Sequence, residues 1–264
     1  YGDEHYRRTD NGLAMYNPFV GNYIMDAFTT EIGGEAYVRA NGFLAMAGVT
    51  GGEIHGQVTQ PQKRSPTFLG KLGYDSQINP DFRFRLTGSV YGTSRSANNT
   101  LYSGDRAGSR YYDVMENTAS TEDANAWSGA IQPKLSSKVT AVVVNPFIKY
   151  QGFEFFGNAE MAKGRGATES VDRTWHQYVG EGLYRFLGDK LYVGGRYNYV
   201  KGSFLGMPTD VNVDRTQAGG GWFVTPTVLL KGEYMVQNYN DFPITDIRSG
   251  GKIKGFMVEG TVSF

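Results

Sequence analysis

The feature that most constrains the fold is a strict alternation of residue types, which is clearest near the C-terminal end. Between residues 252 and 264, every second residue is mostly apolar or glycine, and the residues between them are mixed. The apolar set is Phe256, Val258, Gly260, Val262 and Phe264. A period of two places alternate side chains on opposite faces of a β-strand. The pattern therefore predicts a strand with one apolar face and one mixed face.

The same alternation recurs along most of the chain. It is clear in 82–90, 153–161, 177–186, 191–199 and 228–237, and noisier in 43–49, 68–74, 142–150 and 216–224. With an early segment at 27–40, these segments predict about eleven strands, and a twelfth could lie in 12–25. No stretch carries an apolar stripe at the helical spacing of three and four residues over a comparable length.

The connections between these segments alternate between short and long. Short ones fall at 79–81, 151–152, 188–189 and Pro226, whereas long polar ones fall at about 94–138, 163–172, 203–212 and 239–251. Tight turns at one end of the strands and extended loops at the other are typical of transmembrane barrels. In that class the short turns are periplasmic and the long loops are extracellular.

Composition agrees with this class. Glycine is abundant with 36 residues, tyrosine (18) exceeds phenylalanine (16), and no stretch approaches the 18 or so apolar residues of a membrane helix. The 26 basic and 26 acidic residues balance, which gives no argument for nucleic acid, and the absence of cysteine excludes disulfides and thiolate chemistry. We therefore predict an all-β fold: a transmembrane, antiparallel, up-and-down β-barrel forming a single domain over 1–264.

Three segments carry a resemblance to a known family. They are 16–26 (YNPFVGNYIMD), 46–54 (MAGVTGGEI) and 144–150 (VNPFIKY). They resemble porin-like proteins of the Gram-negative outer membrane, which are often likened to phosphate-selective porins. The resemblance implies a location in the bacterial outer membrane. In such relatives a further N-terminal portion precedes these segments, so we expect that the chain lacks one. From the strand count, a missing N-terminal segment and the sizes of known barrels, we expect a complete barrel of about 12–16 strands.

The final strand supports the same resemblance. An amphipathic last strand that ends in an aromatic residue, here Phe264, is similar to the segment that the barrel-assembly machinery recognises in outer-membrane proteins. The partners expected are therefore this machinery and the outer-membrane lipid, with a homo-oligomer or a lipoprotein as further possibilities and no nucleic acid. No cofactor is expected.

If the apolar face contacts lipid, the mixed face carries the functional residues. We predict that its charged side chains line a pore: Lys71, Arg83, Arg85, Lys149, Glu154, Glu160, Glu181, Arg185, Arg196, Lys231 and Glu233. Asp75 and Glu259 share this face. The alternative is a ladder of structural ion pairs that stiffens or plugs the barrel. Arg83 and Arg85, with Lys71 on the neighbouring strand, form the best candidate cluster for anions, although the glutamates could neutralise it.

The segment 94–138 is the longest stretch without alternation. A loop of this length is normally functional. Two interpretations are equally open: it folds inward and narrows the lumen, or it is an ordinary surface loop with a short hairpin.

The function expected is passive diffusion of small hydrophilic solutes or ions, with a plugged or scaffold barrel in a protein complex as the alternative. A hydrolase is less favoured, because the three histidines, His5, His55 and His176, form no catalytic or metal-binding spacing, and we assign no catalytic residue. The loop aspartates 105, 123, 210, 241 and 246 form no calcium loop, so we assign no metal.

A soluble barrel remains as a different class, since it would alternate with its apolar face inward. A transmembrane barrel would instead place its aromatic residues in two belts. We expect Tyr150, Phe153, Phe186 and Phe264 towards the short turns, and Tyr199 and Trp175 towards the long loops.

Overall fold

A computed structural model describes residues 30–53, 63–104, 115, 121 and 129–264. Eleven strands follow one another in chain order and form one antiparallel sheet, in which each strand pairs with the next. The strands are β1 (Glu31–Ala40), β2 (Phe43–Glu53), β3 (Thr67–Asn79), β4 (Phe82–Thr93), β5 (Lys138–Tyr150), β6 (Phe153–Arg165), β7 (Arg173–Phe186), β8 (Leu191–Gly202), β9 (Val211–Thr225), β10 (Val228–Asn240) and β11 (Lys252–Val262). This up-and-down order confirms the predicted all-β architecture.

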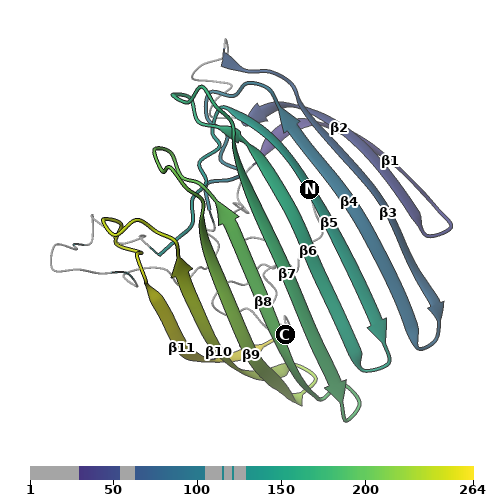
Figure 1. Cartoon of the computed structure of the whole chain (residues 1–264). Coiled ribbons are helices and arrows are strands. Elements are labelled where there is room, and N and C mark those ends of the chain that lie inside the picture. Colours follow the sequence, from purple (N-terminus) through teal and green to yellow (C-terminus); the bar gives the residue numbers. More distant parts are fainter. Residues whose placement is uncertain (1–29, 54–62, 105–114, 116–120, 122–128) are drawn as a thin grey trace.

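The sheet curves into a trough with the strands tilted across it (Figure 1). Its order runs from β1 to β11 without pairing these two strands, so the described part of the chain forms an open sheet. The larger strand number expected for a closed barrel stays a prediction, and the possible strand in 12–25 lies outside the described residues. Within the described ranges, no helix is long and apolar enough to cross a membrane.

The connections alternate as the sequence predicts. Short turns join β1 to β2, β3 to β4, β5 to β6, β7 to β8 and β9 to β10, all at one end of the sheet. Asn41 and Gly42 both adopt positive φ angles of 50° and 84°, as a tight hairpin whose twist matches its strands requires. The longer connections lie at the opposite end: the described parts 94–104 and 129–137 of the β4–β5 connection, and 166–172, 203–210 and 241–251.

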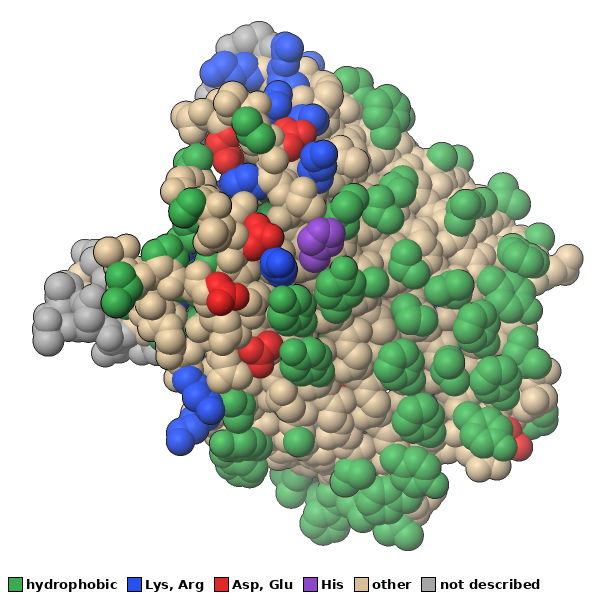
Figure 2. Space-filling model, in the orientation of Figure 1, with side chains coloured by type: hydrophobic (Ala, Val, Ile, Leu, Met, Phe, Trp, Pro, Cys, Tyr) green, Lys and Arg blue, Asp and Glu red, His purple; other side chains and the backbone are tan. Residues whose placement is uncertain are grey.

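The outward face of the sheet is apolar and the inward face is polar. Leu230 and Tyr234 are 44% and 47% exposed, whereas Arg196 and Glu233, at inward positions, are only 2% and 1% exposed. The view in Figure 2 shows the outward wall dotted with hydrophobic side chains below a border of charged ones. This orientation is the reverse of a soluble barrel, and it fits a wall that contacts lipid.

One of the predicted belt residues is misplaced. Trp175 lies on the inward face of β7 and is only 1% exposed, because it packs flat against Gly202 of β8, where a Cβ atom would lie 2.3 Å from the ring. The odd-numbered residues of β7 face inward, so Trp175 belongs to the interior and not to an outer belt. Tyr199 has the outward position expected of it.

Candidate functional site

The inward face of the sheet has an apolar end and a polar remainder. The apolar end lies beneath the long loops, where strand residues such as Val139, Ala162, Val200 and Tyr239 form one buried cluster with Trp175. The rest of the face, towards the short turns, carries most of the charged and amide side chains.

The long segment between β4 and β5 folds against the apolar end of this face. Of its described residues, Leu101, Tyr102, Ile131 and Leu135 are all buried in the same cluster as the strand residues. Tyr102 is completely buried, which an ordinary surface loop would not allow. The described parts of the segment, 94–104 and 129–137, therefore pack against the inward face, which favours the first of the two interpretations left open by the sequence.

Acidic side chains at the outer end hold this inward segment to the wall. The Tyr102 hydroxyl donates to Glu160 Oε1 on β6 at 2.5 Å. The backbone N–H and hydroxyl of Thr100 both donate to Glu53 of β2. Asn99 donates to the Tyr91 hydroxyl at 2.6 Å, and Tyr91 in turn donates to Glu31 at 2.6 Å.

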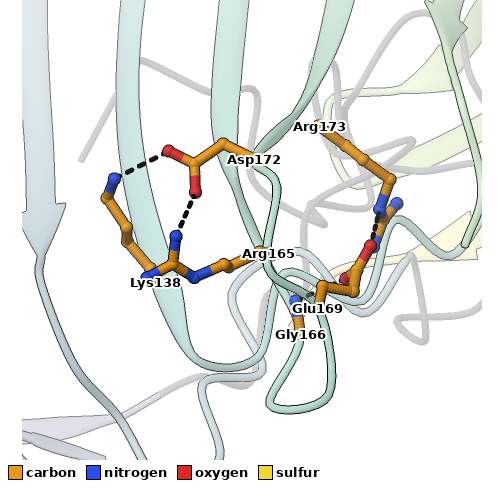
Figure 3. A network of polar contacts seen from close by, with 6 residues as sticks. All are labelled: Lys138, Arg165, Gly166, Glu169, Asp172 and Arg173. Carbon is orange, nitrogen blue, oxygen red and sulfur yellow. Dashed lines mark hydrogen bonds and ion pairs between the residues drawn. The ribbon is translucent and has the colours of Figure 1, made fainter.

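A second attachment comes from Arg173 at the start of β7, drawn in Figure 3. Its guanidinium binds both carboxylate oxygens of Glu169, at 2.5 and 2.9 Å, and donates to the carbonyls of Ser203 and Pro133. One side chain thus connects the β6–β7 loop, the β8–β9 loop and the inward segment. Arg173 also lowers the pKa of Glu169, chiefly through their hydrogen bonds.

A cavity of about 1160 Å³ opens among these loops. Its lining includes Lys134 of the inward segment, Glu169, Arg173 and Phe204. Arg248, in the β10–β11 loop, also lines it and stacks over the rings of Phe204 and Phe242 at 4.6 and 4.7 Å. Arg248 lowers the pKa of Asp246, first through side-chain hydrogen bonds. The cavity therefore lies among the long loops, beside the described part of the inward segment.

Below the inward segment, β6–β10 carry a buried polar network. Glu181 of β7 lies directly opposite Arg196 of β8, and both are about 2% exposed. Arg196 donates to Asn198 at 2.7 Å. Gln217 of β9 donates to Glu233 of β10 at 2.6 Å.

The same network continues along β9 and β10. Arg215 donates a hydrogen bond to Gln237 at 2.7 Å. Lys231 pairs with Glu259 of β11 at 2.6 Å. Most of these side chains thus contact other polar side chains of the wall, while Glu181 Oε2 is buried without a hydrogen-bond partner among the described residues.

Strands β3–β7 present a different surface towards the short turns, which we call the basic wall. Its side chains are half-buried: Lys71, Arg83, Arg85, Lys149 and Arg185, with Asp75 and Glu154. Lys149 and Arg185 each lie 3.1 Å from Glu154, and Arg83 binds Asp75 through two hydrogen bonds of 2.9 and 2.7 Å. Among these half-buried side chains, five cations therefore face two carboxylates, while Glu160 and Glu181 on the same strands are buried.

The predicted basic cluster is rearranged in the structure. Lys71 lies opposite Ser89 and Arg85 opposite Asp75, so an acidic residue enters the cluster. Lys71, Asp75 and Arg85 nonetheless line one cavity of about 800 Å³ on the inward face, together with Glu35 and Arg39. Arg83 and Arg85 both approach the ring of Phe147, with centroid distances of 5.8 and 5.1 Å.

All eleven predicted pore residues thus lie on the inward face. Glu154, Lys149 and Arg185 come together, as do Lys71 and Arg85, whereas Glu160, Glu181, Arg196, Lys231 and Glu233 belong to the buried part. Sequence reasoning missed Arg215 and Arg39. Arg215 was missed because the expected strand began at residue 216, although Arg215 itself continues the alternation of that strand.

The other candidate chemistries give no site in the described ranges. No three His, Asp or Glu side chains there lie close enough to hold a metal ion. His176 lies on the outward face and stacks on Tyr178, with ring centroids 6.4 Å apart. His5, His55, Asp105 and Asp123 lie outside the described residues.

Comparisons with known proteins support the fold. No protein-family model matches the sequence, and no curated protein matches it. Among solved structures, the anion-selective porin from Comamonas acidovorans is 13% identical with a TM-score of 0.56, over 87% of this chain and 58% of that chain. OmpT, an outer membrane protein of Vibrio cholerae, is 11% identical with a TM-score of 0.50, over 86% and 62%. The chain therefore spans about three fifths of these barrels. The shared fold and the apolar outward wall together identify a transmembrane β-barrel protein of the bacterial outer membrane.

Proposed function

We propose that this barrel is a porin-like channel through which small hydrophilic solutes diffuse, and that its inner wall favours anions. The observation that carries the proposal is the separation of charges on the inward face. Acidic residues at the outer end, Glu31, Glu53 and Glu160, are engaged in hydrogen bonds that serve the inward segment and its support. The half-buried basic wall keeps five cations against two carboxylates.

This separation bears directly on the question that the sequence left open. Glu160, Glu181 and Glu233 could have neutralised the basic residues, but all three lie in the buried part. Glu160 and Glu233 accept hydrogen bonds from Tyr102 and Gln217, and Glu181 lies opposite Arg196 on the neighbouring strand. Only Glu154 pairs with basic-wall lysine and arginine side chains as anticipated. A wall with excess positive charge raises the local concentration of anions and lowers that of cations.

The inward segment gives the channel a size limit in this proposal. It covers the outer end of the wall with apolar packing, so solutes would pass between it and the remaining polar surface. The anion selectivity printed in the name of the Comamonas acidovorans porin agrees with the charge argument, although the likeness to that protein supports the fold alone.

The decisive experiment is single-channel recording of the purified protein in planar bilayers. We expect stepwise conductance, a reversal potential in a salt gradient that indicates anion preference, and partial block by neutral sugars below a size threshold. Conductance with clear cation preference would overturn the proposed anion preference but leave the proposed channel intact. Absence of conductance would overturn the channel itself.

The second candidate function is a plugged barrel that serves as a scaffold within a protein complex. It is favoured by the near-complete burial of Glu160, Glu181, Arg196 and Glu233, which a wide water-filled pore would not produce. This candidate predicts no conductance and the recovery of a stable protein complex in mild detergent. The same recording therefore separates the two functions.

A further inference from the structure

The outward face of the barrel carries its charges at one end only. Pairing registers identify the outward residues of each strand, and across β1–β11 these include six cations and one carboxylate: Lys138, Lys163, Arg165, Lys201, Lys252 and Lys254, with Asp214. All seven lie near the long-loop ends of their strands. We call the six cations the outer basic band. In Figure 2 the charged side chains gather along this border of the molecule, whereas the wall below it is mainly apolar.

This distribution is not required by the channel, because outward residues do not contact the lumen. A lysine or arginine on the lipid side of a barrel is costly within the hydrocarbon and tolerated only near the interfaces. The band therefore marks the level of the lipid headgroups on the long-loop side. The strand positions of the band are mainly basic, and the acidic side chains of the adjoining loops, Asp172 and Asp210, compensate only part of its charge.

The centre of the band lies on β6–β8. Lys163 of β6 is opposite Thr174 of β7, and Lys201 of β8 is opposite His176 of β7. Two lysines thus flank a threonine hydroxyl and an imidazole on one surface. Lys163 is exposed, and no described carboxylate lies within ion-pair distance of it. Lys201 approaches Asp210 only at 3.8 Å, with both side chains about half exposed.

The neighbouring cations are held in place beside this centre. Asp172 accepts from Lys138 at 2.7 Å and from Arg165 at 3.2 Å, as Figure 3 shows. These two cations share one carboxylate, so the group keeps positive charge. Directly below lie Met161 and Tyr178, followed by Tyr197. A cationic surface with hydroxyl donors above an apolar wall matches an amphiphile that has a phosphorylated head and acyl chains.

We propose that the outer basic band is a binding site for a phosphorylated lipid of the outer leaflet, centred on Lys163, Thr174, His176 and Lys201. The phosphate would accept from the two lysines and the threonine hydroxyl, and the acyl chains would lie along Met161 and Tyr178. The site is independent of whether the lumen conducts, so its failure and that of the proposed channel are separable.

The test is native mass spectrometry of the full chain in a nonionic detergent. Three probes are titrated: bisphosphorylated lipid A, the same lipid without phosphates, and inorganic phosphate. We expect retention of the phosphorylated lipid, at least roughly tenfold weaker retention of the dephosphorylated lipid, and no retained inorganic phosphate. The double variant Lys163→Gln with Lys201→Gln should lose roughly tenfold in affinity for the phosphorylated lipid.

A matched control is Lys190→Gln in the exposed β7–β8 turn at the opposite end, which should leave lipid binding unchanged. Single-channel conductance of the double variant should also match that of the parent. Equal retention of both lipids, equal binding by the double variant, or binding of inorganic phosphate alone would each overturn the proposal. The proposal would also be overturned if the protein formed an oligomer without lipid and the double variant disrupted that oligomer. If the double variant does not fold, the comparison of the two lipids on the parent protein decides.

Discussion

The inward face contains two regions that look alike in sequence and differ in environment. On β6–β10, Arg196 is 2% exposed and lies opposite Glu181 within a network of amides. On β3–β5, Arg83 is bound to Asp75, but its side chain is 41% exposed. Both arginines occupy inward positions of alternating strands. The difference teaches that alternation determines the face on which a charge lies, whereas neighbouring segments determine whether the charge is structural or accessible to solute.

The largest expected effect tests this difference directly with one substitution in each region. Arg196→Ala would leave the buried Glu181 carboxylate without the cation opposite it, and should lower the free energy of unfolding by about 3–5 kcal/mol. Arg83→Ala removes a half-exposed pair and should cost no more than about 1 kcal/mol. Denaturant unfolding in detergent micelles, followed by the loss of β-sheet circular dichroism, measures both. Equal costs would mean that the two regions do not differ in the way the burial indicates.

A smaller effect is expected where the inward segment meets the network. Tyr102→Phe keeps the ring in the apolar cluster but removes the hydrogen bond to Glu160, so it should cost about 1.5–3 kcal/mol. The weakened attachment should also increase fluctuations of the open-channel current. Tyr184→Phe on the outward face is the matched control, since that side chain is 53% exposed and should tolerate the change. A silent Tyr102→Phe variant would show that packing alone holds the segment.

Next in size is an effect on selectivity without one on stability. Lys71 and Arg85 line the cavity on the basic wall. Replacing both with Gln should lower the ratio of anion to cation permeability by about threefold, because two charges are removed from a partly hydrated wall. Reversal potentials in a salt gradient measure this ratio, with Lys190→Gln in the β7–β8 turn as the control. An unchanged ratio would place the permeation path away from β3–β5.

The alternation made much of this architecture predictable. Strand segments, the polarity of each face and the lengths of the connections all follow from residue order, because they depend on local periodicity. The exceptions have non-local causes. Trp175 was placed in an outer belt because tryptophan favours membrane interfaces, yet the glycine at position 202 on the next strand leaves room for its ring inside. That space depends on a pairing register, which alternation alone does not fix.

The candidate site was predictable in its membership but not in its organisation. The alternation along each strand is enough to place all eleven pore residues on the inward face. The burial of Glu160, in contrast, depends on Tyr102, a residue far away in the chain. The segment 94–138 contains no period, so the sequence could not decide whether it folds inward. Its apolar residues, among them Leu101, Ile131 and Leu135, were the available signal, since a solvated loop has little reason to contain them.

The smallest expected effect concerns pH and the loops above both regions. Arg173 holds the pKa of Glu169 below its ordinary value of 4.5, mainly through their hydrogen bonds. A lowered pKa means that this carboxylate stabilises the folded loop above pH 4.5, and that the contribution is lost as the pH falls through the lowered value. Little change is therefore expected between pH 7 and 5, followed by loosening of residues 166–172 in stronger acid.

Hydrogen exchange of the loop amides, corrected for the intrinsic pH dependence of exchange, measures this loosening. The Gly166 N–H is the most direct reporter, because it donates to Glu169 Oε2 at 2.5 Å. Asp172 and Asp246 also have lowered pKa values, owing first to hydrogen bonds from Lys138 and Arg248, so they titrate in the same direction. Glu169→Gln isolates the contribution of Glu169: the variant should show loosened amides at neutral pH and a weaker acid transition. If parent and variant share one pH profile, Arg173 holds the loops through the Ser203 and Pro133 carbonyls alone.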